Sequence, residues 1–172
     1  MSPPPACLVR RLTHADLPAF RAVRLTALRQ HPEAFGSSYE EESVLDLAGF
    51  ARLVPETQPD AVFGGFAGTD LAGTAGLVVH PRLKQRHKGH VVGVYVAPEH
   101  RQSGLARQLM QAIIAAGQQA DLALLHLAVT RGNEAARRLY LGLGFQIYGV
   151  ERRALRVDGV WYDEELMMLD LD

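Results

Sequence analysis

The segment from Val94 to Ala106 restricts the fold more than any other part of the chain. Apolar residues at 90–96 predict a strand, which stops before Pro98. A helix follows, because apolar side chains recur at helical spacing: Leu105, Leu109, Ile113 and Ala116. A strand that enters a helix through a turn leaves backbone N–H groups unpaired at the positive end of the helix dipole, where they bind phosphate readily. This segment therefore predicts an anion-binding turn that opens a helix at about Ser103.

Hydrophobic periodicity and turn signals divide the rest of the chain into short elements. We expect strands at residues 8–12, 61–67, 71–80, 90–96, 123–129, 145–157 and 160–171, and helices at 13–30, from 39 or 43 to 53, from about 103, and from 133 to about 143. Asp158-Gly159 between two strand-like segments predicts a hairpin. The result is an α/β fold of the α+β type, a mixed central β-sheet of about seven strands flanked by about four helices.

Length and composition predict one ordinary globular domain. The chain has 172 residues, 48% of them hydrophobic and 22% charged, and its formal net charge of −1 lacks the basic excess of nucleic-acid binders. Its single cysteine, Cys7, allows no internal disulfide, which fits a reducing compartment. The sequence shows neither a secretory signal nor a run of about 18 apolar residues that could span a membrane. We expect a cytoplasmic protein with a disordered tail at 1–6, one domain at 7–172, and no nucleic-acid or membrane partner.

The turn carries the first of two motifs, Arg101-Gln102-Ser103-Gly104-Leu105-Ala106. Gly104 lets an anion approach the backbone closely, and Arg101 supplies a cation nearby. Taken alone, Arg-x-x-Gly-x-Ala is a weak pattern, because a helix start with a convenient glycine produces the same letters.

The second motif lies between residues 127 and 145. A predicted strand is followed at fixed intervals by Asn133, Ala136, Tyr140, Gly144 and Phe145. Each residue also has an ordinary role: Asn133 is a good helix N-cap, Gly144 a good helix-ending residue, and Tyr140 a plausible core aromatic. The second motif gains meaning only together with the first.

In this order and at this distance, the two motifs resemble those of the GNAT acetyltransferase superfamily, over residues 7–171. Gln102 and Ala106 stand where many members have glycine, and the pattern tolerates both. The resemblance implies a GNAT-like domain that uses acetyl-CoA as co-substrate and an amine as acceptor. It places the cofactor contacts at Val94, Tyr95, Val96, Arg101, Gln102, Ser103, Gly104, Leu105, Ala106, Arg107, Asn133 and Tyr140.

The resemblance also identifies Tyr140 as the general acid. A phenol, with a usual pKa of about 10, stays protonated at neutral pH and can protonate the leaving CoA thiolate, whose thiol has a usual pKa of about 8.5. A backbone N–H near residues 94–96 can bond the thioester carbonyl oxygen. Direct transfer in a ternary complex then needs no covalent enzyme intermediate.

The base that deprotonates the acceptor is a separate question. His90 is a candidate, because strand parity places it on the same face as Val92 and Val94. An ordinary strand-edge histidine is the alternative. His87 and His90 also have a spacing seen in some metal sites, but the sequence offers no second group at matching spacing, so we expect no metal.

The acceptor itself stays open in the sequence. Glu40-Glu41-Glu42 can attract a cationic amine or form a solvated first turn of helix, and we favour the helix turn. The enzyme can acetylate a small amine, a protein N-terminus or a lysine, or the chain can be a non-catalytic CoA-binding module. The single compact domain favours a small molecule, and Tyr140 argues against the non-catalytic module. A homodimer also stays open.

Overall fold

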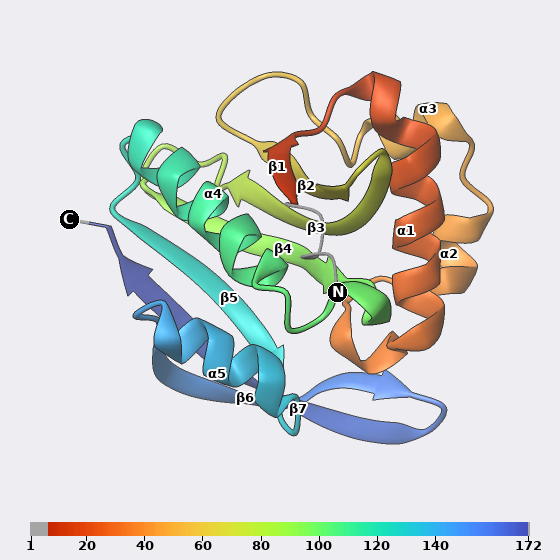
Figure 1. Ribbon diagram of the computed structural model, residues 1–172. Coiled ribbons are helices and arrows are strands. Elements are labelled where there is room, and N and C mark those ends of the chain that lie inside the picture. The colour runs from red at the N-terminus through yellow and green to blue at the C-terminus, as the bar shows by residue number, and fades with distance from the viewer. Residues whose placement is uncertain (1–6, 172) are drawn as a thin grey trace.

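The computed structural model describes residues 7–171, and the tail predicted at 1–6 lies outside them. Seven strands form one sheet in the order β1-β2-β3-β4-β5-β7-β6 (Figure 1). Only β4 and β5 pair in parallel, and the other neighbours are antiparallel. The predicted mixed sheet of about seven strands is confirmed.

The strands are β1 (Leu8–Arg11), β2 (Ala61–Ala67), β3 (Asp70–Val79), β4 (Lys88–Val96), β5 (Leu124–Thr130), β6 (Gln146–Val157) and β7 (Val160–Asp170). The α-helices are α1 (Leu17–Gln30), α2 (Tyr39–Ser43), α3 (Leu47–Ala51), α4 (Leu105–Gln119) and α5 (Glu134–Gly142). Three 3₁₀ helices are η1 (His14–Asp16), η2 (Pro32–Ala34) and η3 (Pro98–His100). Among the described residues, no helix has both the length and the apolar character that crossing a bilayer requires.

Two apolar clusters cover the two faces of the sheet. The apolar stripe of α4 packs on one face, where its most deeply buried side chains are Leu105, Leu109, Met110 and Ile113. Phe20 of α1 and Phe50 of α3 pack on the other face, against Val62 and Phe66 of β2. Burial of each such side chain stabilises the fold by about 1.5–3 kcal/mol. In Figure 1, α4 and α5 lie in front of the sheet, whereas α1, α2 and α3 gather at the right.

The predicted second helix is wrong in its middle, because two short helices replace it. Ser38 and Glu41 form a capping box at the start of α2. Three residues after α2, the Asp46 carboxylate accepts a hydrogen bond from the Gly49 N–H at 2.8 Å and caps α3. Side-chain oxygens that satisfy the first N–H groups favour a new helix start over continuation of the old one.

A bulge interrupts β4 halfway along its length. Thr74 of β3 pairs with Tyr95, whereas Gly76 pairs with Val92, so β4 carries one residue more than β3 between these pairs. Gly93 has φ 61°, a left-handed conformation that glycine adopts without strain. A bulge leaves one residue outside the hydrogen-bond ladder and turns the following side chains to the opposite face.

The bulge changes the face of β4 on which the later residues lie, and this affects the argument that made His90 the candidate base. His90 and Val92 precede it and share a face, as predicted. Val94 follows Gly93 and packs against the cluster beneath α4. The prediction that all three residues share one face is therefore wrong at Val94.

Strands β4 and β5 separate after a short paired stretch. Their parallel pairing covers Lys88, Gly89 and His90 only. Beyond this point β5 stays paired with β7 as far as Thr130, while β4 stays with β3 as far as Val96. The sheet therefore opens between two strands that are neighbours at their beginnings, and Figure 1 shows the two strands diverging.

Candidate active site

A cleft of about 1490 Å³ lies where β4 and β5 separate. Residues 91–96 of β4 and 127–130 of β5 form its walls, and the starts of α4 and α5 line it as well. We call the part lined by His100, Arg101, Gln102, Gly104, Leu105, Ala106 and Arg107 the turn side. We call the part lined by Arg24, Glu33, Phe35, Leu155, Tyr162 and Glu164 the hairpin side, after the β6–β7 hairpin.

The turn side presents a row of free backbone donors. Among the amides of residues 102–107, only that of Leu105 has a partner within the described chain, the Ser103 hydroxyl oxygen at 3.3 Å. Gly104 is the N-cap of α4, and both Gly104 (φ 84°) and Gln102 (φ 61°) have left-handed backbones that orient this turn. Free N–H groups at a helix start fit the oxygens of a diphosphate. The left-handed backbone of Gln102 also gives a physical reason for the glycine that many family members carry there.

Arg101 is held in place beside this turn. Its Nε donates to the Val96 carbonyl oxygen at 3.1 Å, and its terminal nitrogen lies 3.0 Å from Nε2 of His31. Because a guanidinium can only donate, the His31 nitrogen is the acceptor. Ser103 differs from the other predicted cofactor residues, since its hydroxyl donates to the His100 carbonyl and it does not line the cleft.

Tyr140 reaches the cleft from the buried side of α5. Asn133 caps this helix by accepting from the Ala136 N–H at 3.2 Å, and also lines the cleft. The Tyr140 side chain is 6% exposed and its ring lies 5.9 Å from that of Phe145. Every fully buried side-chain nitrogen or oxygen of the described residues has a hydrogen-bond partner, and the Tyr140 hydroxyl has none, so this hydroxyl must keep contact with the cleft. Burial raises the pKa of Tyr140 above its usual value, which keeps the phenol protonated.

Val94, Tyr95 and Val96 line the cleft where the bulge disturbs β4. The Tyr95 hydroxyl donates to the Gln30 side chain at 3.0 Å, which ties α1 to the strand. The Thr74 hydroxyl donates to the Gly93 carbonyl at 3.0 Å and fixes the bulge. These contacts hold a stretch of irregular backbone next to the space that Tyr140 faces.

His90 lies outside the lining of the cleft. Its ring centre is 5.6 Å from that of His126 and 6.4 Å from that of His80, on the stretch where β4 and β5 still pair. Burial, followed by the charges of His80 and Lys88, lowers the pKa of His90. The structure thus brings eleven of the twelve predicted cofactor residues to one cleft but does not bring His90 there.

The hairpin side contains residues that the sequence analysis missed. Arg24 of α1 forms a bidentate pair with the buried Glu42, at 2.7 and 2.9 Å. The acidic run forms the first turn of α2, as favoured, and Glu41 belongs to its cap. The expectation that the whole run is solvated is wrong for Glu42, whose charge is buried and balanced by Arg24. Glu164 of β7 lies far along the chain from Arg24 and Glu33, and no local sequence pattern predicts that the three residues line one cleft.

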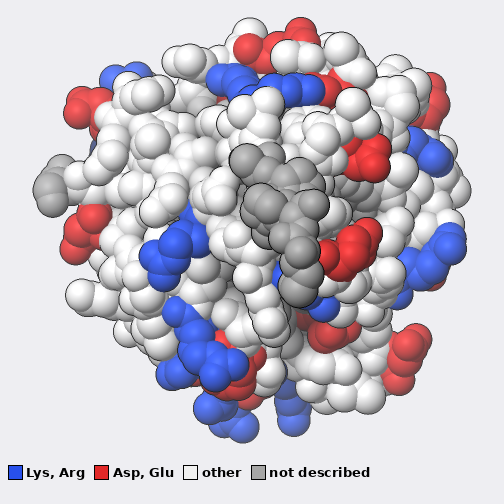
Figure 2. Space-filling model, in the orientation of Figure 1, with Lys and Arg blue, Asp and Glu red and all other residues white. Residues whose placement is uncertain are grey.

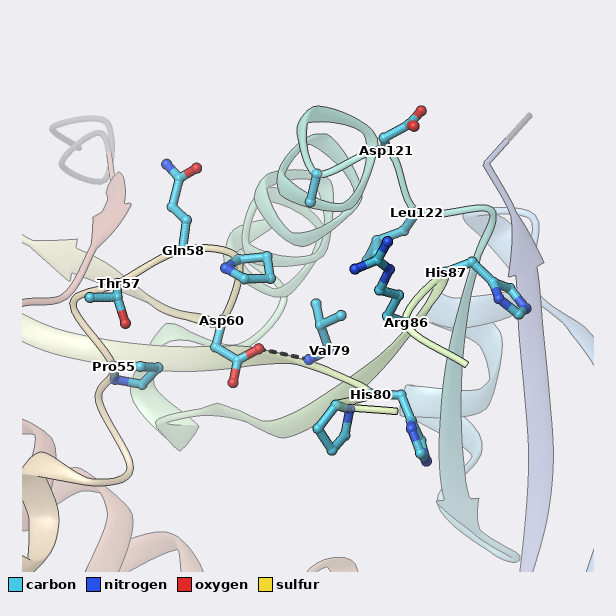
Figure 3. A pocket seen from close by; sticks show the side chains of 13 residues that line it. Pro55, Thr57, Gln58, Asp60, Val79, His80, Arg86, His87, Asp121 and Leu122 are labelled. Carbon is cyan, nitrogen blue, oxygen red and sulfur yellow. Dashed lines mark hydrogen bonds between the residues drawn. The ribbon is translucent and has the colours of Figure 1, made fainter. Parts of the chain in front are cut away.

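A second pocket of about 620 Å³ lies away from both motifs (Figure 3). There the Asp60 carboxylate reaches across to the Val79 N–H at 2.8 Å, and the side chains of His80, Arg86 and His87 lie around the hollow. Within residues 7–171, His, Cys, Asp and Glu side chains form no group of three that could hold a metal ion. The expectation of no metal stays a prediction.

Charge on the face that carries α4 and α5 is mixed. Basic and acidic side chains are interspersed there, and the basic ones are densest toward the lower left, over α5 (Figure 2).

Comparison with known proteins agrees with this geometry. Residues 11–145 match the model of the acetyltransferase (GNAT) family. An uncharacterized N-acetyltransferase, YoaA of Bacillus subtilis, is 29% identical over 124 residues, covering 72% of this chain and 69% of that protein. A mycothiol acetyltransferase of Kocuria rhizophila is 37% identical over 143 residues, covering 79% of this chain but only 44% of that protein.

The fold has a close counterpart among solved structures. The structure of yncA from Salmonella typhimurium, determined with its cofactor acetyl-CoA, superposes with a TM-score of 0.85 at 22% sequence identity and covers 97% of this chain and 95% of that chain. At this identity the likeness concerns the fold, whereas the family match extends over most of the sequence. The chain belongs to the GNAT acetyltransferase family, whose members are N-acetyltransferases that use acetyl-CoA.

Proposed function

We propose that this protein transfers the acetyl group of acetyl-CoA directly to the primary amine of a small molecule. One observation carries the proposal: the free amides of the turn side and the hydroxyl of Tyr140 open into the same cleft. The two motifs are thus separate in the sequence but meet at one cleft in the fold. The proposed roles rest on this meeting and on the family to which the chain belongs.

The residues present fit acetyl-CoA by their chemistry. The amides at 102–107 other than that of Leu105, with the guanidinium groups of Arg101 and Arg107, are a donor set for a diphosphate. Residues 94–96, next to the bulge, offer backbone groups to the chain that leads from the diphosphate to the thioester. When bound, acetyl-CoA supplies the activated acetyl group and the thiol leaving group.

Tyr140 is proposed as the acid. Its hydroxyl has no partner within the described residues, and its raised pKa keeps the phenol protonated and able to donate. The proton passes to sulfur as the C–S bond breaks, and the acetylated nitrogen, which must lose a proton, replaces it. Asn133 holds the start of α5, and through this helix it helps to position Tyr140.

A small acceptor is favoured by the way the hairpin side is enclosed. Segment η2 packs against β5, where the Thr130 hydroxyl donates to the Glu33 carbonyl at 2.7 Å. Leu155 and Tyr162 of the β6–β7 hairpin line the same side. Such cover restricts the width available to an acceptor, although a flexible peptide end remains the alternative for the test.

The experiment measures acetyl-CoA binding by calorimetry, then thiol release against spermidine, an amino acid, glucosamine and a peptide with a free N-terminus. We expect binding, with release against one of the three small amines. Release against the peptide alone would contradict the proposed small-molecule acceptor and indicate a protein acceptor instead. Binding without any release would favour a CoA-binding module. Absence of binding would show that the turn of residues 101–106 is only a helix start.

A further inference from the structure

Five side chains that line the cleft carry an imidazole or a carboxylate, the groups that most often act as a base: His31, Glu33, Asp60, His100 and Glu164. Asp60 is engaged by the Val79 N–H at 2.8 Å, at the end of the cleft near the second pocket. His100 belongs to η3, on the turn side. These two side chains are therefore poorly placed to meet an acceptor on the hairpin side.

Two further candidates are engaged with each other and with the turn. The His31 nitrogen Nε2 already accepts from Arg101 at 3.0 Å. The carboxylate of Glu33 lies 3.8 Å from the other ring nitrogen of His31. A proton taken up by either group would disturb this chain of contacts.

Among the carboxylates that line the cleft, only that of Glu164 has neither a hydrogen bond nor an ion pair within the described residues. It lies on β7, opposite Thr130 of β5 and opposite Glu151 of β6. Its side chain is half-buried and lines the hairpin side. Like charges directly opposite each other on a sheet are destabilising, so the pair with Glu151 has no evident structural benefit.

The surroundings of Glu164 favour its protonated form. Burial, followed by the charge of Glu151, raises the pKa of Glu164 above the usual value of a glutamate. Tyr162, two positions along β7, also lines the cleft, and Glu33 approaches from the η2 segment that packs on β5 and β6. Arg131 and Asp163, the next residues along β5 and β7, lie 3.9 Å apart and so offset each other.

We propose that the carboxylate of Glu164 is the general base that takes a proton from the ammonium group of the acceptor. This inference rests on the proposed function. One N–H bond of the ammonium breaks, its proton joins the carboxylate, and the electron pair stays on nitrogen. As the new C–N bond forms and the C–S bond breaks, Tyr140 gives its proton to sulfur and regains one from the acetylated nitrogen. Glu164 later releases its proton to water, so each turnover frees one proton.

The test compares two nucleophiles in the Glu164→Gln variant. One is the most active amine of the panel, which is an ammonium ion at pH 7, and the other is hydroxylamine, which is neutral at that pH. With the amine, we expect kcat/KM at pH 7 to fall about 100-fold and to recover as the pH rises, since free amine then replaces the lost base. With hydroxylamine we expect little change. Acetyl-CoA affinity, measured by calorimetry, should equal that of the wild type.

Two variants serve as controls. Glu151→Gln removes the opposing charge, so we expect the acid limb of the pH profile to move to lower pH while turnover persists. His90→Gln removes the candidate derived from the sequence, and we expect no selective loss with the amine. Equal losses with both nucleophiles, or a selective loss in His90→Gln instead of Glu164→Gln, would overturn the proposal.

A measurement without any acceptor separates this inference from the proposed function. Carbon-13 NMR of glutamate-labelled protein, assigned with Glu164→Gln, follows the carboxyl group directly. We expect a raised pKa that falls in Glu151→Gln, and a usual or lowered pKa would overturn the inference while leaving acetyl-CoA binding intact. Failure of the wild type to bind acetyl-CoA would instead remove the proposed function, and this inference with it.

Discussion

The two sides of the cleft are built by different means. The turn side comes from one continuous segment, and it combines free backbone N–H groups with the side chains of Arg101 and Arg107. The hairpin side is assembled from α1, the 31–37 segment and the β6–β7 hairpin, and it presents side chains such as Arg24 and Glu164. Backbone groups bind in the same way whatever the side chains are, whereas side-chain contacts change with each substitution. The fold can therefore keep one cofactor while the acceptor varies.

Tyr140 lies between the two sides, and Tyr140→Phe should have the largest effect on the reaction. The hydroxyl makes no protein contact within the described residues, so its loss should lower kcat by about 100-fold and leave binding of both substrates unchanged. Stopped-flow and steady-state assays of thiol release measure kcat, and calorimetry measures the affinity for acetyl-CoA. Tyr148→Phe is the matched control, because Tyr148 is 52% exposed and does not line the cleft. Wild-type turnover in Tyr140→Phe against an active amine would remove Tyr140 as the acid.

The hairpin side depends on a buried ion pair, which Glu42→Gln should break. Arg24 would then keep a nearly buried charge with only a neutral partner, so we expect the free energy of unfolding to fall by about 2 kcal/mol. The KM for the amine should rise, while acetyl-CoA affinity stays the same. Chemical denaturation and calorimetry test the two parts. Glu40→Gln, two residues away and exposed, should change neither.

The turn side depends on backbone shape, which Gly104→Ala should disturb. At φ 84° an alanine is strained by about 1–2 kcal/mol, although no described atom lies within 4 Å of the added carbon. We expect acetyl-CoA to bind about 10-fold more weakly, because the strain changes the directions in which the free backbone N–H groups of the turn point.

Gly68→Ala is a close match for Gly104→Ala. Gly68 has φ 63°, equally open surroundings, and a position in the β2–β3 turn outside the cleft. Both variants should lose similar stability in thermal unfolding, but only Gly104→Ala should lose affinity. Equal affinities in the two variants would mean that the turn is not the anion site.

The same contrast explains what the sequence could reveal. The elements, their order and the turn side are local features: an apolar stripe such as Leu105 and Leu109, and a glycine at a helix start, are visible in a short window. The contact between Arg101 and His31 joins residues 70 positions apart. No local sequence pattern near either residue predicts this contact, because side-chain contacts across the fold depend on how the elements pack.

The bulge at Gly93 shows how a small irregularity limits a parity argument. Regular alternation predicts one face for His90, Val92 and Val94, and a single extra residue transfers Val94 to the other face. The separation of β4 from β5 is equally hard to foresee, because both strands continue beyond it with apolar residues. Yet the separation creates the cleft, and it leaves His90 on the paired stretch outside it.

The smallest predicted effect concerns the pH dependence of stability, and it comes from the stretch where β4 and β5 still pair. It should leave both sides of the cleft unchanged. Burial, and then neighbouring charges, lower the pKa values of His90 and His126, so both rings are held in the neutral form. Below about pH 6.5 the unfolded chain binds protons first, and stability is lost as the pH falls through the lowered pKa values of the folded state.

His90→Gln and His126→Gln should each reduce this loss, by less than about 1 kcal/mol, because water screens these partly buried rings. The His90 charge also lowers the pKa of His126, so removal of the His90 ring brings His126 closer to its usual value. The double variant should therefore gain less than the sum of the single variants in denaturation at pH 5 relative to pH 7. Strict additivity would mean that the two rings titrate independently. A change in acetyl-CoA affinity would mean that the paired stretch and the cleft are coupled after all.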